Sequence, residues 1–231
     1  MPMKNAVHPL RIALPDGGSV SAVLDRPAEP IACLVLAHGA GAGMQHPFIA
    51  GLAAALGGHG IATLRYQFPF MEQGSKRPDR PAVAQAAVRA AVGAAAVHLP
   101  GVALFAGGKS FGGRMSSQAQ ADAPLPRVRG LVFVGFPLHP AGKPGTERAD
   151  HLERVALPML FLQGTRDALA EWPLVRQTVE RLGSRATLHI VEGADHAFHV
   201  PARSGRTDAE VIETLAGAAA GWMRTLAQPS T

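Results

Sequence analysis

The stretch from Val102 to Ser116, VALFAGGKSFGGRMS, constrains the fold most, because an apolar run leads directly into a glycine cluster around one serine. Residues 108–112 read Gly-Lys-Ser-Phe-Gly, which is the pattern G-x-S-x-G. Between a strand and a helix, this pattern predicts a sharp turn that holds the serine in a strained conformation above the sheet edge. A β-carbon at position 108 or 112 would collide with the neighbouring backbone. The pattern alone leaves open a plain glycine-rich turn in which Ser110 only caps the helix.

Strand and helix patterns alternate along the rest of the chain, after an antiparallel hairpin at the start. We expect strands at 11–14, 19–24, 31–37, 61–64, 102–106, 128–134, 159–162 and 186–191. We expect helices at 48–56, 81–98, 111–121, 171–182 and 208–227. This alternation predicts an α/β fold with a doubly wound, mostly parallel sheet. The longest insertions, 65–80 and 136–149, are too short for a large lid domain.

Length and composition fit one α/β domain over residues 1–231. The chain has no apolar run of about 18 residues and no signal-peptide pattern, so we expect a cytoplasmic protein that does not enter a membrane. The net charge is +5, but the basic residues are scattered, which argues against nucleic acid as a partner. The single cysteine, Cys33, excludes a disulfide framework, and no histidine pair has metalloprotease spacing. We therefore expect no metal and no cofactor.

Two further residues follow expected strands and complete a set with Ser110. Asp167 comes just after the strand at 159–162, and His196 comes just after the strand at 186–191. Functional residues of such sheets lie beyond the carboxyl ends of the strands, and the order Ser, Asp, His is that of a hydrolase triad on this fold. The imidazole would take the serine proton, and the carboxylate would orient the imidazole. The Ala40 and Phe111 amides are the candidate oxyanion donors.

Other residues could fill two of these roles. His199 is an alternative base, and Glu171 and Asp150 are alternatives to the aspartate. Asp195 adjoins His196 in sequence and would not readily curl back to its imidazole. His38 follows a strand, and we expect it to hold its loop through a hydrogen bond.

Aromatic and basic residues near the strand ends are candidate substrate contacts. Four aromatic residues could form an apolar pocket wall, although packing of the loops onto one another explains them equally well: Tyr66, Phe68, Phe136 and Trp172. Arg65 and Arg114 could bind an anionic group of a substrate, and Lys109 and Lys143 share this ambiguity. A cation in a first helical turn opposes the helix dipole, so we expect Arg114 to have an anionic partner, a buried carboxylate rather than a substrate.

These residues resemble the α/β-hydrolase superfamily, near its small, lidless, dienelactone-hydrolase-like members. The closer likeness is to a family that includes a testis-expressed hydrolase-like protein and a subunit of the NSL histone acetyltransferase complex. The matching stretches are HGAGAG at 38–43, LRYQFPF at 64–70, GGKSFGGRMSS at 107–117, GFPLHPAGKP at 135–144, QGTRDAL at 163–169 and GADHAF at 193–198. The resemblance implies the fold and a triad at Ser110, Asp167 and His196. Some members look like interaction subunits.

The sequence thus predicts a serine hydrolase of the esterase type that cleaves a small ester or related acyl compound through an acyl-enzyme. A small-molecule acyl substrate is the expected partner. The alternative is an interaction protein that keeps the fold with little or no turnover. A compact peptidase is a third hypothesis, weakened because no gating domain is visible.

Overall fold

The computed structural model describes residues 6–227. Eight strands form one sheet in the order β1-β2-β4-β3-β5-β6-β7-β8. The strands are β1 (Ala6–Ala13), β2 (Ser19–Arg26), β3 (Ala32–Ala37), β4 (Ile61–Tyr66), β5 (Ala103–Lys109), β6 (Val128–Val134), β7 (Met159–Gly164) and β8 (Ala186–Val191). The α-helices are α1 (Pro47–Gly58), α2 (Pro69–Glu72), α3 (Pro81–His98), α4 (Phe111–Asp122), α5 (Trp172–Leu182) and α6 (Asp208–Ala227). The predicted α/β class with a mostly parallel sheet is confirmed.

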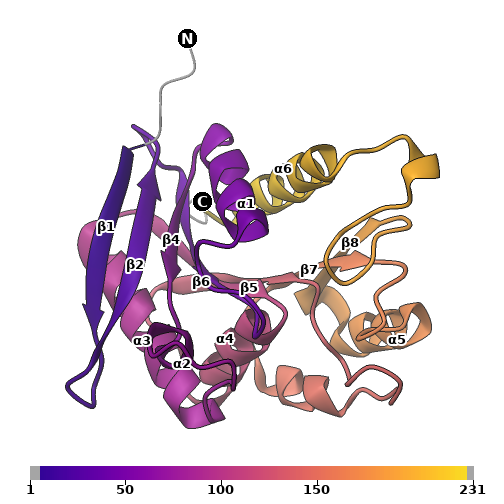
Figure 1. Cartoon of the computed structure of the whole chain (residues 1–231), viewed down its shortest axis with the longest axis horizontal. Coiled ribbons are helices and arrows are strands. Elements are labelled where there is room, and N and C mark those ends of the chain that lie inside the picture. Colours follow the sequence, from indigo (N-terminus) through magenta and orange to yellow (C-terminus); the bar gives the residue numbers. More distant parts are fainter. Residues whose placement is uncertain (1–5, 228–231) are drawn as a thin grey trace.

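The central strands are buried on both faces, which explains their unbroken apolar runs. In β3, Cys33 and Val35 belong to one hydrophobic core, whereas Leu34 and Leu36 belong to a second. Successive side chains of a strand point to opposite faces, so each core lies on its own side of the sheet. Helices α1 and α6 cover one face, and α3 and α4 cover the other (Figure 1).

The first two strands form the predicted hairpin at the edge of the sheet. β1 pairs with β2, and β2 pairs with β4, both in antiparallel orientation. The turn between β1 and β2 is closed by the Gly18 carbonyl, which accepts a hydrogen bond from the Leu14 amide at 2.8 Å. From β3 to β8, all neighbouring strands are parallel, so their carboxyl ends meet at one edge.

Both long insertions contain short helices that were not predicted. α2 lies within 65–80, and the 3-10 helix η1 (Glu147–Arg154) begins within 136–149. Pro69 opens α2, where its missing N–H costs nothing, and Phe70 is buried. The Glu72 carboxylate then accepts the Ser21 amide at 3.0 Å and fastens α2 to β2. A helix of four residues has no hydrophobic period to read, and its anchor lies 51 residues away.

Among residues 6–227, no helix is both long and apolar enough to cross a membrane.

Candidate active site

Ser110 occupies the turn between β5 and α4, with backbone angles φ 50° and ψ −112°. This conformation is strained for a residue with a β-carbon. The backbone around it is packed too closely for side chains: a β-carbon at Gly108 would lie 2.1 Å from the Ala37 carbonyl oxygen. One at Gly112 would lie 2.6 Å from the His38 carbonyl oxygen. The Ser110 side chain makes no capping bond to α4, so the capping alternative is wrong.

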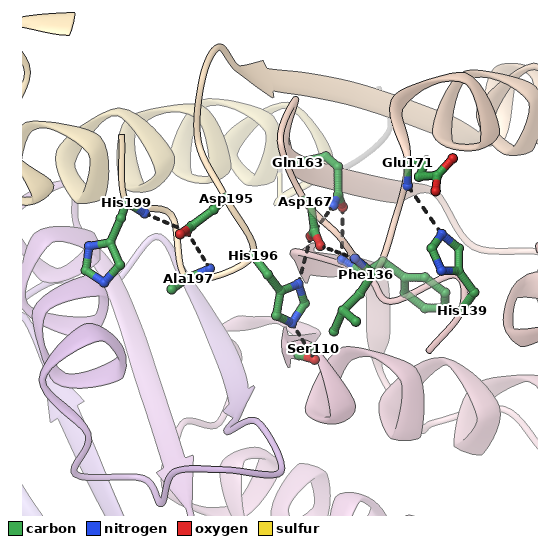
Figure 2. A network of polar contacts seen from close by, with 11 residues as sticks. Ser110, Phe136, His139, Gln163, Asp167, Glu171, Asp195, His196, Ala197 and His199 are labelled. Atoms are coloured by element: carbon green, nitrogen blue, oxygen red, sulfur yellow. Dashed lines mark hydrogen bonds and ion pairs between the residues drawn. The ribbon is translucent and has the colours of Figure 1, made fainter. Parts of the chain in front are cut away.

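The structure brings the three predicted residues Ser110, His196 and Asp167 together (Figure 2). Ser110 Oγ lies 2.9 Å from His196 Nε2, and His196 Nδ1 lies 2.7 Å from Asp167 Oδ2. Because Asp167 accepts the proton at Nδ1, the neutral imidazole presents an unprotonated Nε2 to the serine. The arrangement can therefore accept a proton from the Ser110 hydroxyl.

The Asp167 carboxylate is fully buried and held by three hydrogen bonds. Besides the one from His196, Oδ2 accepts one from Gln163 Nε2 at 2.7 Å, and Oδ1 accepts one from the Leu169 amide at 2.8 Å. Gln163 in turn accepts the Phe136 amide at 3.0 Å, which joins the loops after β6 and β7. Sequence reasoning missed Gln163. Its signal was available, since it is a polar residue at the end of an otherwise apolar strand.

The alternative bases and acids lie elsewhere. His199 is exposed and pairs with Asp208 at 2.7 Å. The Asp195 carboxylate accepts the Ala197 and His199 amides and so shapes the loop that carries His196 (Figure 2). Glu171 immediately precedes α5, and its amide donates to His139 Nε2 at 3.4 Å. Asp150 is exposed and lies 3.9 Å from Arg181.

His38 has the structural position that was expected. Its Nδ1 lies 2.7 Å from the Gly39 carbonyl, and its Nε2 accepts the Phe68 amide at 3.0 Å. Nδ1 must then carry the proton and donate. Burial lowers the pKa of His38, which keeps the ring neutral. His38 thereby ties the loop after β3 to the loop after β4.

Three of the four aromatic residues proposed as a substrate wall are core residues, so that prediction is wrong for them. Tyr66, Phe68 and Phe136 are at most 1 % exposed. Tyr66 and Phe68 pack edge to face, and Phe136 packs against Phe133 and Phe161. Large apolar side chains gain most by burial, so the loop-packing explanation holds. Trp172 is partly buried and is absent from the residues that line the two cavities at Ser110.

Arg65 is also structural rather than a substrate contact. Its guanidinium donates to Asp25 at 2.9 Å and to the Met44 carbonyl at 2.9 Å. Both side chains of this pair are about nine-tenths buried. A buried ion pair with such bonds fixes the loop after β3, and it leaves no free charge for a ligand. Sequence alone could not reveal the pairing, because Asp25 lies 40 residues earlier.

Two cavities flank Ser110. The first, of about 330 Å³, has mostly apolar walls that include Phe48 and Ile49, and His196 lies at its edge. The second, of about 350 Å³, is bounded by Phe111, Arg114 and Arg148. Ala40 borders both cavities. The candidate oxyanion donors Ala40 and Phe111 thus lie beside Ser110.

The basic residues near Ser110 differ in their surroundings. Lys109 Nζ is buried, has no hydrogen-bond partner in the described part of the chain, and lies 5.6 Å from the centre of the Phe198 ring. Burial lowers its pKa to about 8, opposed by the charges of Asp167 and Asp195. Lys143 is exposed.

The expected carboxylate partner of Arg114 is absent. Within residues 6–227, no carboxylate oxygen lies within 4.0 Å of its guanidinium, and its buried Nε is unbonded. The expectation of a buried carboxylate was therefore wrong.

No group of three or more metal-ligating side chains occurs in the part of the chain that the structure describes.

Solved structures of hydrolases share this fold. A serine hydrolase homologue from Coxiella burnetii superimposes with a TM-score of 0.73 at 24 % identity, over 91 % of this chain and 96 % of its own. A serine hydrolase without a lid from Xanthomonas campestris gives 0.73 at 22 % identity, over 100 % and 98 %. A dienelactone hydrolase from Anabaena variabilis gives 0.76 at 19 % identity, over 96 % and 99 %. At these identities the likeness shows the fold alone.

The sequence itself also matches a described family. Residues 30–224 match an alpha/beta hydrolase domain, a span that runs from just before β3 into α6 and includes Ser110, Asp167 and His196. The chain therefore belongs to the alpha/beta hydrolase family.

Proposed function

We propose that this protein is a serine hydrolase that cleaves a small carboxylic ester, or a related acyl compound, through an acyl-enzyme. The observation that carries the proposal is the continuous hydrogen-bonded chain from Ser110 Oγ through His196 to Asp167. The proposed roles are nucleophile for Ser110, general base and acid for His196, and orienting carboxylate for Asp167.

The proton balance of the reaction follows from this chain. Ser110 Oγ attacks the ester carbonyl carbon while its proton moves to His196 Nε2. The tetrahedral intermediate collapses when the bond to the leaving oxygen breaks and His196 returns the proton to that oxygen. Water then attacks the acyl-Ser110 ester by the same steps, releases the carboxylic acid and restores the serine. Asp167 stays ionised and stabilises the imidazolium in both halves.

The Ala40 and Phe111 amides are the proposed oxyanion donors. Phe111 begins α4, so its N–H has no partner within the helix and lies at the positive end of the helix dipole. Ala40 lies in a loop of small residues, and both residues border a cavity together with Ser110. Each such donor contributes about 10²- to 10³-fold to the rate in related sites.

The ester class rests on the apolar cavity and on analogy. The cavity that contains Ser110 and His196 is walled mainly by apolar atoms, which suits a small uncharged leaving group. The Anabaena relative of the fold is a dienelactone hydrolase, and a lactone is a cyclic ester. The interaction-protein alternative, suggested by the closer likeness to the testis-expressed and NSL-subunit family, called for a blocked Ser110 or a displaced His196. Neither condition holds among the described residues.

The test is burst kinetics with p-nitrophenyl acetate and butyrate, together with fluorophosphonate labelling. We expect wild type to release a burst of p-nitrophenol and to take up one equivalent of label, and Ser110→Ala to do neither. Ser184→Ala removes an exposed hydroxyl outside the site and serves as the matched control, with unchanged turnover. Labelling of folded Ser110→Ala equal to that of wild type would disprove the proposal.

A further inference from the structure

The second cavity at Ser110 is bordered by two cationic side chains for which the described residues provide no anionic partner. Arg114, in the first turn of α4, and Arg148, in η1, both border it. Neither guanidinium has a carboxylate oxygen within 4.0 Å among residues 6–227. Two like charges beside one cavity repel each other, and accordingly the pKa of Arg114 is lowered first by burial and then by Arg148. Such a pair costs stability unless an anion occupies the cavity.

Three carboxylates from the elements around this cavity are engaged with other groups. Asp122 pairs with Arg154 at 3.5 Å, and Asp150 lies 3.9 Å from Arg181. Asp79 borders the same cavity, but its Oδ2 accepts the Phe70 amide at 3.0 Å, and burial raises its pKa. One carboxylate therefore faces two guanidinium groups, and the cavity carries a net positive charge.

His151, which is linked to the helix of Arg114 through Ser117, adds no charge beside Arg114. His151 Nε2 lies 2.8 Å from the Ser117 hydroxyl, which also donates to the Arg114 carbonyl. Its pKa is lowered to about 4, mainly by burial and then by the charges of Arg154 and Arg114. The ring is neutral at physiological pH. The charge of Arg114 is thus left uncompensated on this side as well.

The position of His196 assigns the two cavities to the two halves of a substrate. The leaving oxygen must receive its proton from His196 Nε2, so the leaving group lies on the side of that ring. His196 lines the apolar cavity and is not part of the lining of the cationic one. The acyl half would then extend toward Arg114 and Arg148.

We propose that the substrate carries an anionic group, a carboxylate or a phosphate, on its acyl half, and that Arg114 and Arg148 bind this group. Planar guanidinium groups suit either anion through paired N–H donors. This inference rests on the proposed function and narrows its substrate class to esters whose acyl part is an anion. Arg114 and Arg148 act as specificity residues.

The kinetic test compares p-nitrophenyl hydrogen glutarate and adipate with their methyl esters, which are uncharged and nearly the same size. We expect wild type to give a higher kcat/KM for the anionic member of each pair. The ratio of the two kcat/KM values should fall by about 10-fold in Arg148→Gln and by about 10- to 100-fold in Arg114→Met. Arg114→Lys should recover part of the loss. Arg176→Gln, which removes an exposed charge on α5, should leave activity and ratio unchanged.

A second arm places the anion on the leaving group instead. 4-Acetoxybenzoate and its methyl ester should show no preference that depends on Arg114 or Arg148. A preference confined to this pair, or a wild-type ratio of one or less for the glutarate and adipate pairs, would overturn the proposal while leaving the serine hydrolase intact.

Binding to Ser110→Ala, measured by calorimetry with adipate and with butyl phosphate, separates the two anions and needs no turnover. Binding of either that is lost in Ser110→Ala/Arg114→Met supports the cationic cavity as an anion site even if no ester is hydrolysed. Binding of neither, in folded protein, refutes it. Absence of Ser110-dependent turnover with every ester counts against the proposed function instead.

Discussion

Two buried charged groups lie within the candidate site, and their surroundings differ sharply. The Asp167 carboxylate accepts three hydrogen bonds, from Gln163, His196 and the Leu169 amide. The buried Lys109 ammonium, by contrast, donates no hydrogen bond to any of residues 6–227. Its charge is compensated by the face of the Phe198 ring, whose centre lies 5.6 Å away, and by the charges of Asp167 and Asp195.

The two environments stabilise the enclosed charges to different degrees. A buried carboxylate with several donors keeps its charge, because the donors replace the water that it has lost. A buried ammonium without acceptors loses its proton more readily, and the pKa of Lys109 falls to about 8. The hydrogen bonds to Asp167 are therefore those that suit a buried carboxylate. Lys109 carries a charge that the fold tolerates at a cost.

Removal of the Asp167 charge should have the largest effect. In Asp167→Asn the amide can donate to His196 Nδ1, which would then hold the ring in the tautomer that presents a proton to Ser110. We expect kcat for p-nitrophenyl butyrate to fall by about 10⁴-fold, as in other Ser-His-Asp enzymes, with fluorophosphonate labelling slowed in parallel.

The matched control is Asp195→Asn, one residue from His196. The Asp195 carboxylate accepts two backbone amides, and the asparagine oxygen can still accept them. We expect less than about a 10-fold loss of kcat. Equal losses in the two variants would show that the local charge, and not the bond to His196, determines the rate.

Much of this arrangement could be predicted from sequence, because it depends on local patterns. The turn at Ser110 follows from glycines with no room for a β-carbon, and the order of Ser110, Asp167 and His196 follows from their places after strands. Parallel strands bring such positions to one edge, so three residues spread over 86 positions could be placed together.

The remaining contacts depend on side chains that meet only after folding. Arg65 pairs with Asp25, and the side chains of Tyr66 and Phe68 are buried in the core. The residues adjacent in sequence predict neither the ion pair nor this burial. The absence of a partner at Arg114 is likewise a property of the packed loops. Sequence could flag these residues as unusual but could not distinguish a core contact from a ligand contact.

Removal of the buried Lys109 charge should increase the free energy of unfolding by an amount that depends on pH. Below pH 8 the lysine is protonated in the folded and unfolded states, so folding bears the full burial cost. Between pH 8 and 10.5 the unfolded chain binds the extra proton, and wild-type stability therefore rises with pH. The lowered pKa corresponds to about 3 kcal/mol. Lys109→Met should be more stable than wild type by up to about this amount at pH 7.

Urea denaturation at pH 7, 8, 9 and 10 measures this difference. The advantage of Lys109→Met should shrink steadily above pH 8. Lys76→Met, at an exposed position, should show no such trend. A gain that stays constant across the series would mean that methionine packs better and that the charge is not the cause.

The smallest expected effect is that of replacing Gln163, which supports the Asp167 charge without touching Ser110 or His196. Its amide donates to Asp167, and its carbonyl accepts the Phe136 amide, so Gln163→Met removes one donor from the carboxylate and leaves one buried N–H unpaired. Each loss amounts to about 1 kcal/mol. Stability should fall by about 2 kcal/mol in urea, and the pH dependence of kcat/KM should change as well, since a carboxylate with fewer donors stabilises the imidazolium differently.

Thr178→Val, which removes a buried hydroxyl on α5 that donates to the Leu174 carbonyl, is the control for stability alone. If Gln163→Met lowers stability like Thr178→Val and leaves the pH profile unchanged, Gln163 joins two loops and has no part in holding the charge. A shifted pH profile of kcat/KM at similar stability would instead identify Gln163 as a positioning residue. The groups that stabilise the Asp167 charge would then include a residue beyond Ser110, Asp167 and His196, the three that the sequence order reveals.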